Sequence, residues 1–470
     1  MAQGPEGWAD VSFHGSPQIP TPNLDALAST GVVLNNYYVM PLCSPSRGAL
    51  MSGRYCIHIG FQHCVLLPAQ PGGLPLELTI MPQHFRDLGY ETHMIGKWHL
   101  GYSTEQYMPT NRGFNSFLGL HTGPEDYYSH ILRWGDNEGL DFWSGTEPLT
   151  TKNGTYSTTL FTDRAKSIIR NRDNSKPLFL YLAHQATHAG IEPYLLEAPT
   201  ENVAKFPYIN DMERTHYAGA LDAVDQSVAE VLQELEAASM LENTVIVFSS
   251  DNGGAPQNNS LSNCANNSPL RGSKGSLWEG GVRVAAFLWS ADLLPHRRVS
   301  HQLMHITDWL PTLYSAAGGD VTSLGELDGF DMWSALNVGK PSPRTEILLN
   351  IDQQGGRLHC APKISTAAVL TRLYEQEDVF KNVGRWREEA TLTCDDDVNK
   401  NFESGETYYL FDVARDPCEQ RNLAKDQPEL LFALLDKLSV YNKTVVPPVN
   451  DTIDPRGYPQ YNDGIWKPWL

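Results

Sequence analysis

The sequence predicts an α/β fold with a central mixed, mostly parallel sheet, and two kinds of segment support that prediction. Residues 91–95, 178–182 and 244–249 are short runs with the character of buried strands in a sheet that helices cover on both faces. Residues 221–235 place apolar side chains at steps of three and four, which indicates an amphipathic helix.

Two domains are expected from the length of 470 residues and from a change of character near residue 340. Residues 339–343, Gly-Lys-Pro-Ser-Pro, read as a linker between a large α/β domain (1–340) and a smaller α+β domain (341–470). A helix with a leucine-rich face is predicted over residues 428–441. The aromatic end of the chain, residues 464–470, is expected to dock on the body of the protein.

The composition excludes several classes of function. A formal net charge of -20 argues against a general binder of nucleic acid or of membrane surfaces. No apolar run approaches the roughly 18 residues that a membrane-spanning helix needs. Because an acidic surface repels anionic substrates at long range, a site for an anion needs basic residues of its own.

The sequence has glycosylation triplets typical of the secretory pathway but no signal-peptide pattern in its first residues. The first residues, Met-Ala-Gln-Gly-Pro-Glu, have neither a basic segment nor an apolar core, so no signal peptide is expected there. Acceptor triplets for N-glycosylation nevertheless begin at five asparagines in polar segments: Asn153, Asn258, Asn266, Asn442 and Asn450. The expected location of the parent protein is therefore lysosomal or secreted.

The cysteines and several histidines have simple structural readings. Cys360 and Cys394 flank a predicted loop and are candidates for a disulfide, although sequence does not fix the pairing. Four zinc-ligand types occur close together: Cys56, His58, His63 and Cys64. Their spacing fits no usual structural zinc site, and a local disulfide or free thiols explain the cysteines equally well. Three histidines are predicted to be structural: His14, His121 and His130.

Side chains that can bind ions or move protons follow each of the three predicted strands. Lys97 and His99 come after the first, His188 after the second, and Asp251 and Asn252 after the third. Ligands of open α/β sheets bind beyond the carboxyl ends of the strands, so we expect these side chains to meet at one edge.

Each of these residues also has an ordinary alternative. Asp251 and Asn252 are hard oxygen donors that suit Ca²⁺ or Mg²⁺, but Asp-Asn-Gly-Gly also favours a turn. Lys97 can bind an anion or be a solvated loop lysine, and a lone His188 favours a structural role. Lys274 lies in a glycine-rich loop that lets backbone approach a ligand, although the loop does not match a phosphate-binding loop.

The most informative stretch is Cys43-Ser44-Pro45-Ser46-Arg47, which Arg54 follows closely. A cysteine that lies just before a proline and near two arginines suits a nucleophile that attacks an anionic group. The planar guanidinium of arginine can bind two oxygens of one sulfate or phosphate at the same time. Cys43 alone reads more simply as a buried or disulfide-linked cysteine. The whole pentapeptide, however, matches the C-x-P-S-R motif of the sulfatase family, which the chain resembles.

The resemblance extends over nearly the whole chain. Further motifs follow in sulfatase order: Gly-Lys-Trp-His-Leu-Gly at 96–101, Gly-x-Glu-Asp-Tyr-Tyr-Ser-His at 123–130, Ser-Asp-Asn-Gly-Gly at 250–254, Leu-Arg-Gly-x-Lys at 270–274 and Leu-Trp-Glu-Gly-Gly-Val-Arg at 277–283. They are most similar to those of N-acetylgalactosamine 4-sulfatases. This implies an alkaline-phosphatase-like fold, and as substrate a 4-sulfated N-acetylgalactosamine unit of a glycosaminoglycan or an aryl sulfate.

The resemblance also implies a role for each candidate residue. Cys43 is the residue that the formylglycine-generating enzyme converts to formylglycine, whose hydrated aldehyde attacks sulfur, and Arg47 holds that hydrate. Three residues bind the sulfate and assist the leaving oxygen: Lys97, His188 and Lys274. His99 helps to release sulfate from the covalent intermediate. Three residues bind Ca²⁺: Asp251, Asn252 and Cys43.

The amino terminus departs from the family pattern. Sulfatases begin with a buried strand that ends in an Asp-Asp pair before Gly-Trp, and both acids bind the metal. Here Gly7-Trp8 follows Gly4, Pro5 and Glu6, and Glu6 stands at a different offset from the absent acids. We therefore expect the first strand to be missing, Ca²⁺ to bind weakly and turnover to be impaired. The alternative function is an inactive sulfatase-like protein that binds sulfated sugars.

Overall fold

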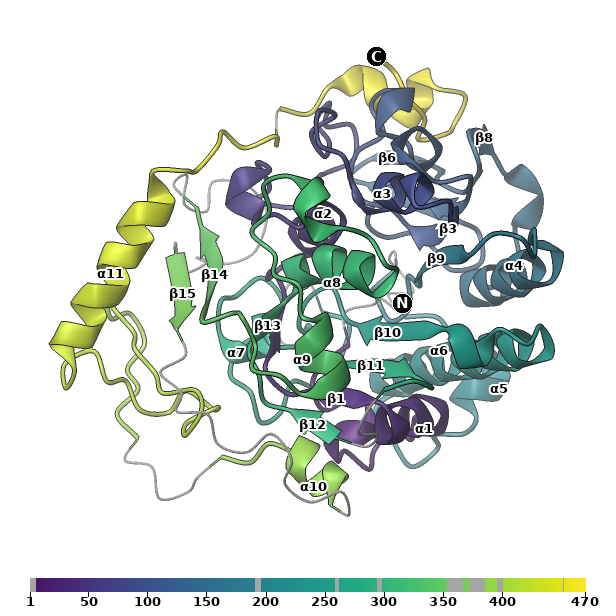
Figure 1. The fold of residues 1–470 in the computed structure, drawn as a ribbon. Coiled ribbons are helices and arrows are strands. Elements are labelled where there is room, and N and C mark those ends of the chain that lie inside the picture. The colour runs from purple at the N-terminus through teal and green to yellow at the C-terminus, as the bar shows by residue number, and fades with distance from the viewer. Residues whose placement is uncertain are drawn as a thin grey trace.

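The computed structural model describes residues 6–190, 196–257, 262–293, 298–352, 367–371, 385–394, 400–450 and 452–470. In this part of the chain, helices pack against strands that run through the middle of the molecule (Figure 1). The predicted α/β class is confirmed. None of the described helices is long and apolar enough to cross a bilayer.

The described α-helices and strands are spread along the whole chain. The helices are α1 (Pro22–Thr30), α2 (Cys43–Ser52), α3 (Met81–Asp87), α4 (Ser157–Asn171), α5 (Thr200–Val203), α6 (Met212–Ala237), α7 (Glu279–Val282), α8 (Trp309–Ala316), α9 (Trp333–Val338), α10 (Trp386–Ala390) and α11 (Pro428–Asn442). The strands are β1 (Val32–Leu34), β2 (Tyr37–Tyr38), β3 (Glu91–Lys97), β4 (Ser116–Leu120), β5 (Ile131–Trp134), β6 (Asn137–Leu140), β7 (Trp143–Ser144), β8 (Glu147–Pro148), β9 (Leu178–Ala183), β10 (Val245–Ser249), β11 (Ala286–Ser290), β12 (Arg298–Ser300), β13 (Met304–His305), β14 (Glu346–Ile351) and β15 (Ala367–Thr371).

The larger sheet has its strands in the order β8-β7-β4-β3-β9, and its centre is parallel. β3 pairs in parallel with β4 on one side and with β9 on the other, so that Ile95 lies opposite Leu182. The pairs β4–β7 and β7–β8 are antiparallel. The strands predicted over residues 91–95 and 178–182 are confirmed, and they are direct neighbours.

The second sheet has the order β10-β11-β1-β12. β11 is antiparallel to both β10 and β1, whereas β1 and β12 are parallel. β10 confirms the third predicted strand, and the helix predicted over residues 221–235 lies within α6. The main strands of the body therefore form two sheets instead of one central sheet, with parallel and antiparallel pairs mixed.

An apolar cavity of about 620 Å³ lies between the two sheets. β9 and β10 are each the last strand of their sheet, and consecutive residues of both segments, 177–182 and 244–248, line the cavity. Helices complete the lining, with Val231 and Leu235 from α6 and Leu313 from α8. We call this cavity the β9–β10 slot. A strand placed in it would join the two sheets into one.

The part after residue 340 is a small unit that returns to the body. β14 and β15 pair in antiparallel fashion, and α11, which confirms the helix predicted over residues 428–441, lies beside them (Figure 1). Trp466 near the end of the chain is fully buried, and its Nε1–H donates to Leu132 O at 3.1 Å. The aromatic end therefore docks as predicted, while the domain boundary at residue 340 stays a prediction.

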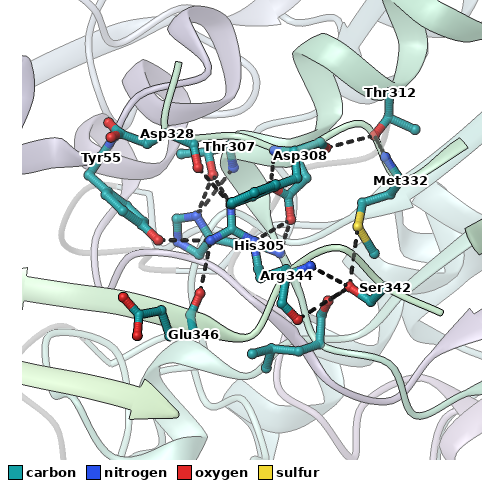
Figure 2. Close-up of polar contacts among 12 residues, drawn as sticks. Tyr55, His305, Thr307, Asp308, Thr312, Asp328, Met332, Ser342, Arg344 and Glu346 are labelled. Carbon is teal, nitrogen blue, oxygen red and sulfur yellow. Dashed lines mark hydrogen bonds and ion pairs between the residues drawn. The ribbon is translucent and has the colours of Figure 1, made fainter. Parts of the chain in front are cut away.

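One buried arginine ties this C-terminal part to the body (Figure 2). The guanidinium of Arg344, which precedes β14, forms an ion pair with Asp308, and the two side chains are 1% and 0% exposed. Arg344 Nη1 donates to Tyr55 Oη at 2.8 Å, and Nη2 donates to Asp328 O at 2.8 Å. A single side chain thus satisfies groups from three distant segments.

Replacement of Arg344 by methionine is expected to lower the free energy of unfolding by about 3–5 kcal/mol, because Asp308 keeps a buried charge without its partner. Denaturant unfolding at neutral pH measures the change. The double variant Arg344→Met, Asp308→Leu removes both charges and should recover part of the loss. Arg385→Met is the control, because the side chains of the Arg385–Glu388 pair are 75% and 74% exposed. Equal effects of Arg344→Met and Arg385→Met would contradict this role.

The disulfide prediction was wrong. Cys394 is bonded to Cys418, 24 residues further along, and not to Cys360, which lies outside the described residues. Cys64 is also disulfide-bonded, whereas Cys56 is a free buried thiol, so the two do not form a local bridge. Pairing depends on which segments the fold brings together, and spacing along the chain does not encode that.

The cysteine–histidine cluster is not arranged as a zinc site. His58 Nδ1 is 2.7 Å from Asp328 Oδ2, and His63 Nδ1 is 3.0 Å from Asp352 Oδ2, so the two histidines face different acids. Within the described ranges, no group of three or more His, Cys, Asp or Glu side chains is placed to hold a metal ion. Among the glycosylation triplets, Asn153 and Asn442 are exposed, Asn266 and Asn450 are half-buried, and Asn258 lies outside the described residues.

The three histidines predicted to be structural are all buried. His130 Nδ1 lies 3.3 Å from Glu125 Oε1. His121 stacks on Phe117 at 5.2 Å and on Tyr102 at 5.8 Å between ring centroids. Neither of its ring nitrogens has a hydrogen-bond partner within the described ranges. Burial lowers the pKa of His121 from 6.5 to about 3.

This burial makes the fold sensitive to acid. Below pH 6.5 the unfolded chain binds a proton at residue 121 that the folded chain excludes, so stability is lost as the pH falls from 6.5 towards 3. His121→Phe is expected to raise the free energy of unfolding by about 2 kcal/mol more at pH 5 than at pH 8. Denaturant unfolding at the two pH values measures this difference. A pH-independent effect of His121→Phe would contradict the argument.

Candidate active site

The carboxyl ends of β3, β9 and β10 meet the start of α2, as the sequence predicted for the three strands. Lys97 is the last residue of β3, His188 lies in the loop after β9, and Asp251 and Asn252 follow β10 directly. Cys43 is the first residue of α2, and it is 1% exposed. Segments that are far apart in sequence thus share one small buried space.

Cys43 lies at the centre of this space. Its Sγ donates to Asn252 Oδ1 at 3.2 Å, and Lys274 Nζ lies 3.5 Å from the same sulfur. Lys274 Nζ is also 3.1 Å from His188 Nε2. The side chains predicted to act on a sulfate group therefore do surround the predicted nucleophile position.

The surroundings favour a negative charge at Cys43. Burial alone would raise the pKa of its thiol, but the charges of Lys274 and Lys97, with interactions from His188 and His99, hold the pKa well below its usual value of 9.0. The first turn of α2 adds unsatisfied backbone N–H groups and the positive end of the helix dipole. The site is therefore built to stabilise an anion.

The basic residues differ in protonation. Burial lowers the pKa of Lys97 to about 8, although the charges of Cys43 and Asp251 favour its protonated form. Burial and the charges of Lys274 and Lys97 lower the pKa of His188 to about 3. His188 Nδ1 faces Ala189 O at 2.7 Å, so Nδ1 carries the hydrogen and Nε2 accepts from Lys274. A neutral histidine thus orients a charged lysine.

His99 has one free basic nitrogen. Its Nε2 donates to Leu66 O at 2.9 Å, while Nδ1 is buried without a hydrogen-bond partner among the described atoms. Burial lowers the pKa of His99, which keeps Nδ1 unprotonated at neutral pH. The end of β3 depends on Gly96, since a Cβ there would lie 1.9 Å from Ala183 O of the neighbouring strand.

Arg47 lies among the same strand ends. Its guanidinium is 1% exposed and forms an ion pair with Asp251, with Nη2 at 2.9 Å from Oδ2. Nη1 donates to the carbonyl of Lys97 and lies 3.4 Å from Tyr181 Oη. Arg47 therefore joins the strand ends together. Tyr181 is an addition to the predicted set, and its signal is a polar hydroxyl within an otherwise apolar buried strand.

The oxygen donors suit a cation but are few. Asp251 Oδ1 is buried and lacks a hydrogen-bond partner among the described residues, as expected of an atom that faces a positive ion. Asn252 Oδ1 is the second donor, and Ca²⁺ takes six to eight oxygen ligands. Glu6 is fully buried and acts electrostatically on Tyr127 and Tyr217. The described residues therefore offer fewer oxygen donors here than Ca²⁺ takes.

Comparisons with known proteins agree with this arrangement. A sulfatase family model matches residues 5–319. Mouse arylsulfatase J is 37% identical over 498 residues, which cover 99% of this chain and 78% of that protein. Human N-acetylgalactosamine-6-sulfatase is 31% identical over 71% of this chain and 64% of its own length. Human arylsulfatase A is 29% identical over 91% of this chain and 84% of its length.

Solved structures support the same conclusion. Ps i-CgsB in complex with k-i-k-neocarrahexaose has a TM-score of 0.78 and 27% identity, covering 96% of this chain and 94% of that one. The PsFucS1 sulfatase from Pseudoalteromonas sp. has a TM-score of 0.71 at 22% identity, over 96% and 91% of the two chains, and supports the fold alone. The relatives do not single out the predicted 4-sulfatase group, arylsulfatase B. The chain belongs to the sulfatase family, the hydrolases of sulfuric esters.

Proposed function

We propose that this chain removes sulfate from sugars with a formylglycine made from Cys43 by the formylglycine-generating enzyme. The single observation that carries the proposal is the position of Cys43, at a helix start with Lys274 Nζ 3.5 Å from its sulfur. Formylglycine supplies a hydrated aldehyde that acts as the nucleophile in sulfate transfer. Enzymes of this family generally use this residue together with a divalent metal.

The proposed roles follow from charge and geometry. The cations of Lys274 and Lys97 neutralise the oxygens of a bound sulfate, in a buried site where such charges act strongly. Lys274 Nζ, held by His188 Nε2 at 3.1 Å, gives a proton to the leaving sugar oxygen. His99 Nδ1 accepts a proton when the sulfate is released and the aldehyde re-forms.

The proposed metal is Ca²⁺, with Asp251 and Asn252 as two ligands and residue 43 as a third. Arg47 holds Asp251 Oδ2 and leaves Oδ1 free for the ion. Because this donor set is smaller than Ca²⁺ prefers, we expect weak binding and slow turnover by the chain as it stands.

The proposed substrate is a 4-sulfated N-acetylgalactosamine unit of a glycosaminoglycan, with aryl sulfates as small substitutes. The resemblance of the motifs supports this choice, and the carrageenan oligosaccharide in the Ps i-CgsB complex supports a sulfated polysaccharide more generally. The proposed location is lysosomal or secreted, in keeping with the exposed triplets at Asn153 and Asn442.

The test is co-expression with the formylglycine-generating enzyme, followed by mass spectrometry of the peptide with residue 43. We expect conversion of Cys43 and hydrolysis of an aryl sulfate and of an N-acetylgalactosamine 4-sulfate disaccharide with Ca²⁺ present. Cys43→Ala is the matched control and should be inactive. Conversion without any hydrolysis, in a folded protein that contains Ca²⁺, would contradict the proposal.

The second candidate is an inactive sulfatase-like protein that binds sulfated sugars. The small oxygen donor set beside Asp251 favours it, since sulfate transfer in this family depends on a metal. It predicts that Cys43→Ala and the matured protein bind a sulfated disaccharide equally well and that neither cleaves it. Calorimetry on both proteins, with the activity assay, separates the two candidates.

A further inference from the structure

A second cavity lies on the loop that carries Lys274. It measures about 540 Å³, within the roughly 300–1,000 Å³ of typical ligand sites. Five residues line it: Arg271, Cys394, Lys400, Phe402 and Gln420. None of them belongs to the candidate active site described above. We call this cavity the Arg271 pocket.

Arg271 is held by aromatic rings instead of by an acid. The central carbon of its guanidinium lies 3.7 Å from the ring centroid of Phe402 and 5.7 Å from that of Trp278. Its Nε is buried and has no hydrogen-bond partner in the described part of the chain. Cation–π contacts fix the direction of the side chain and leave its donors available for a ligand.

The charge of Arg271 is also poorly compensated. The acid that acts on it is Glu419, but burial and the charge of Glu279 hold the pKa of Glu419 well above its usual range. A shift in this direction reduces the negative charge on Glu419 that could balance the guanidinium. The protein has a net charge of -20, so a guanidinium that no nearby acid fully neutralises is suited to bind an anion.

The walls of the pocket are firm and mixed in character. Phe402 stacks on Tyr409 at 5.6 Å, and Tyr409 stacks on Phe411 at 6.2 Å. The Cys394–Cys418 disulfide fixes a further wall. Gln420 Oε1 is buried and has no hydrogen-bond partner among the residues that the structure describes, so it can accept from a hydroxyl. Aromatic faces pack against sugar rings, while cations and amides bind their polar groups.

The position of the pocket links it to the site of sulfate removal. Arg271 stands three residues before Lys274, so their Cα atoms are at most about 11 Å apart. A polysaccharide with one sulfate at Lys274 Nζ is long enough to span this distance to the segment that carries Arg271. Lys400, which is exposed, supplies a second cation at the rim.

We infer that the Arg271 pocket binds a second anionic group, a carboxylate or a sulfate, on the sugar next to the one that loses its sulfate. The inference rests on the proposed function, because it concerns the sugar that neighbours the reacting unit in the proposed polysaccharide substrate. It explains how an acidic protein binds an anionic polysaccharide at a second point in addition to the sulfate that reacts.

The experiment compares a chondroitin sulfate tetrasaccharide with an aryl sulfate. Arg271→Met keeps the stem that packs on Phe402 and removes the charge, and Arg271→Lys restores a charge. Lys400→Met changes an exposed position and leaves the fold intact. Arg415→Met is the control, because the Arg415 side chain is 89% exposed. Calorimetry uses the tetrasaccharide and each variant in the Cys43→Ala background, so binding is read without turnover.

Arg271→Met is expected to weaken tetrasaccharide binding about ten- to a hundredfold, the range for a lost hydrogen bond between charged groups. Lys400→Met should weaken it less, Arg271→Lys should restore part of it, and Arg415→Met should change nothing. In matured enzyme, kcat/KM for the tetrasaccharide should fall several times more than kcat/KM for the aryl sulfate.

Three outcomes decide the matter. Unchanged tetrasaccharide binding in both Arg271→Met and Lys400→Met overturns the inference. Equal losses of kcat/KM for the two substrates also overturn it, because Arg271 would then act only through the loop of Lys274. If the parent protein binds the tetrasaccharide through Arg271 but cleaves no sulfate ester, the proposed function fails and the pocket assignment stands.

Discussion

A six-residue apolar strand placed directly before Glu6 is expected to raise the free energy of unfolding of this protein by several kcal/mol. The β9–β10 slot has about 620 Å³ of apolar space, bordered by edge strands on two sides. Each apolar side chain buried there contributes roughly 1.5–3 kcal/mol. New ladder hydrogen bonds to β9 and β10 would satisfy backbone groups that now lie at sheet edges.

The direction of this strand follows from the position of Gly7. A Cβ built on Gly254, just beyond the end of β10, would lie 2.9 Å from Gly7 Cα. A segment that leads into Glu6 through the slot therefore runs parallel to β10 and ends beside Asp251. Because helices lie over both faces of the slot, apolar residues are required at every position of the inserted strand.

Denaturant unfolding and thermal melting of the extended and parent chains measure this effect. The matched control carries proline at the third position of the same segment, since proline removes a ladder hydrogen bond and is excluded from central strands. The apolar segment should raise the melting temperature and the proline segment should not. Equal melting temperatures for the two extended chains would show that the segment does not enter the slot.

The same variant tests the metal site. Two aspartates at the end of the inserted strand would add carboxylates next to Asp251 and Asn252 and bring the donor set closer to what Ca²⁺ prefers. We expect Ca²⁺ to raise the melting temperature of this variant more than that of the same strand ending in two asparagines. An equal response of both chains to Ca²⁺ would place the ion elsewhere.

The sequence predicted the elements that local pattern encodes. Residues 178–182 and 244–249 are apolar runs, and α6 and α11 carry regular apolar faces, so propensity and burial favour the same state. The expectation that Lys97, His188 and Asp251 meet follows from a general property of strand ends in α/β sheets. These predictions required no knowledge of contacts.

The features that the sequence did not predict depend on contacts between distant segments. The Cys394–Cys418 bond, the capture of Asp251 by Arg47 and the addition of Tyr181 are decided by which segments the fold places together. The split into two sheets has the same origin. β9 and β10 each read as central strands from their own residues, and only the arrangement in space leaves both as edges.

Replacement of Lys274 by alanine is expected to lower kcat/KM for an aryl sulfate about a hundred- to a thousandfold, the usual effect of removing one stabilising group at a developing charge. In the proposed mechanism two functions disappear together: the cation that neutralises the sulfate and the proton on Lys274 Nζ, which lies 3.1 Å from His188 Nε2. Lys274→Arg keeps the charge but not the proton donor, so it should restore binding more than kcat. Lys340→Ala, at an exposed position, is the control.

The unmatured protein gives a readout that does not depend on turnover. Against the effect of burial, the charge of Lys274 is the largest influence that lowers the pKa of Cys43, so Lys274→Ala should raise that pKa towards 9.0. Ultraviolet titration of the thiolate measures the pKa in the parent, Lys274→Ala and Lys274→Arg proteins. A loss of activity without a change in thiol pKa would place the lysine away from residue 43. A raised thiol pKa with normal activity would mean that the anion site at Cys43 is not where sulfate is transferred.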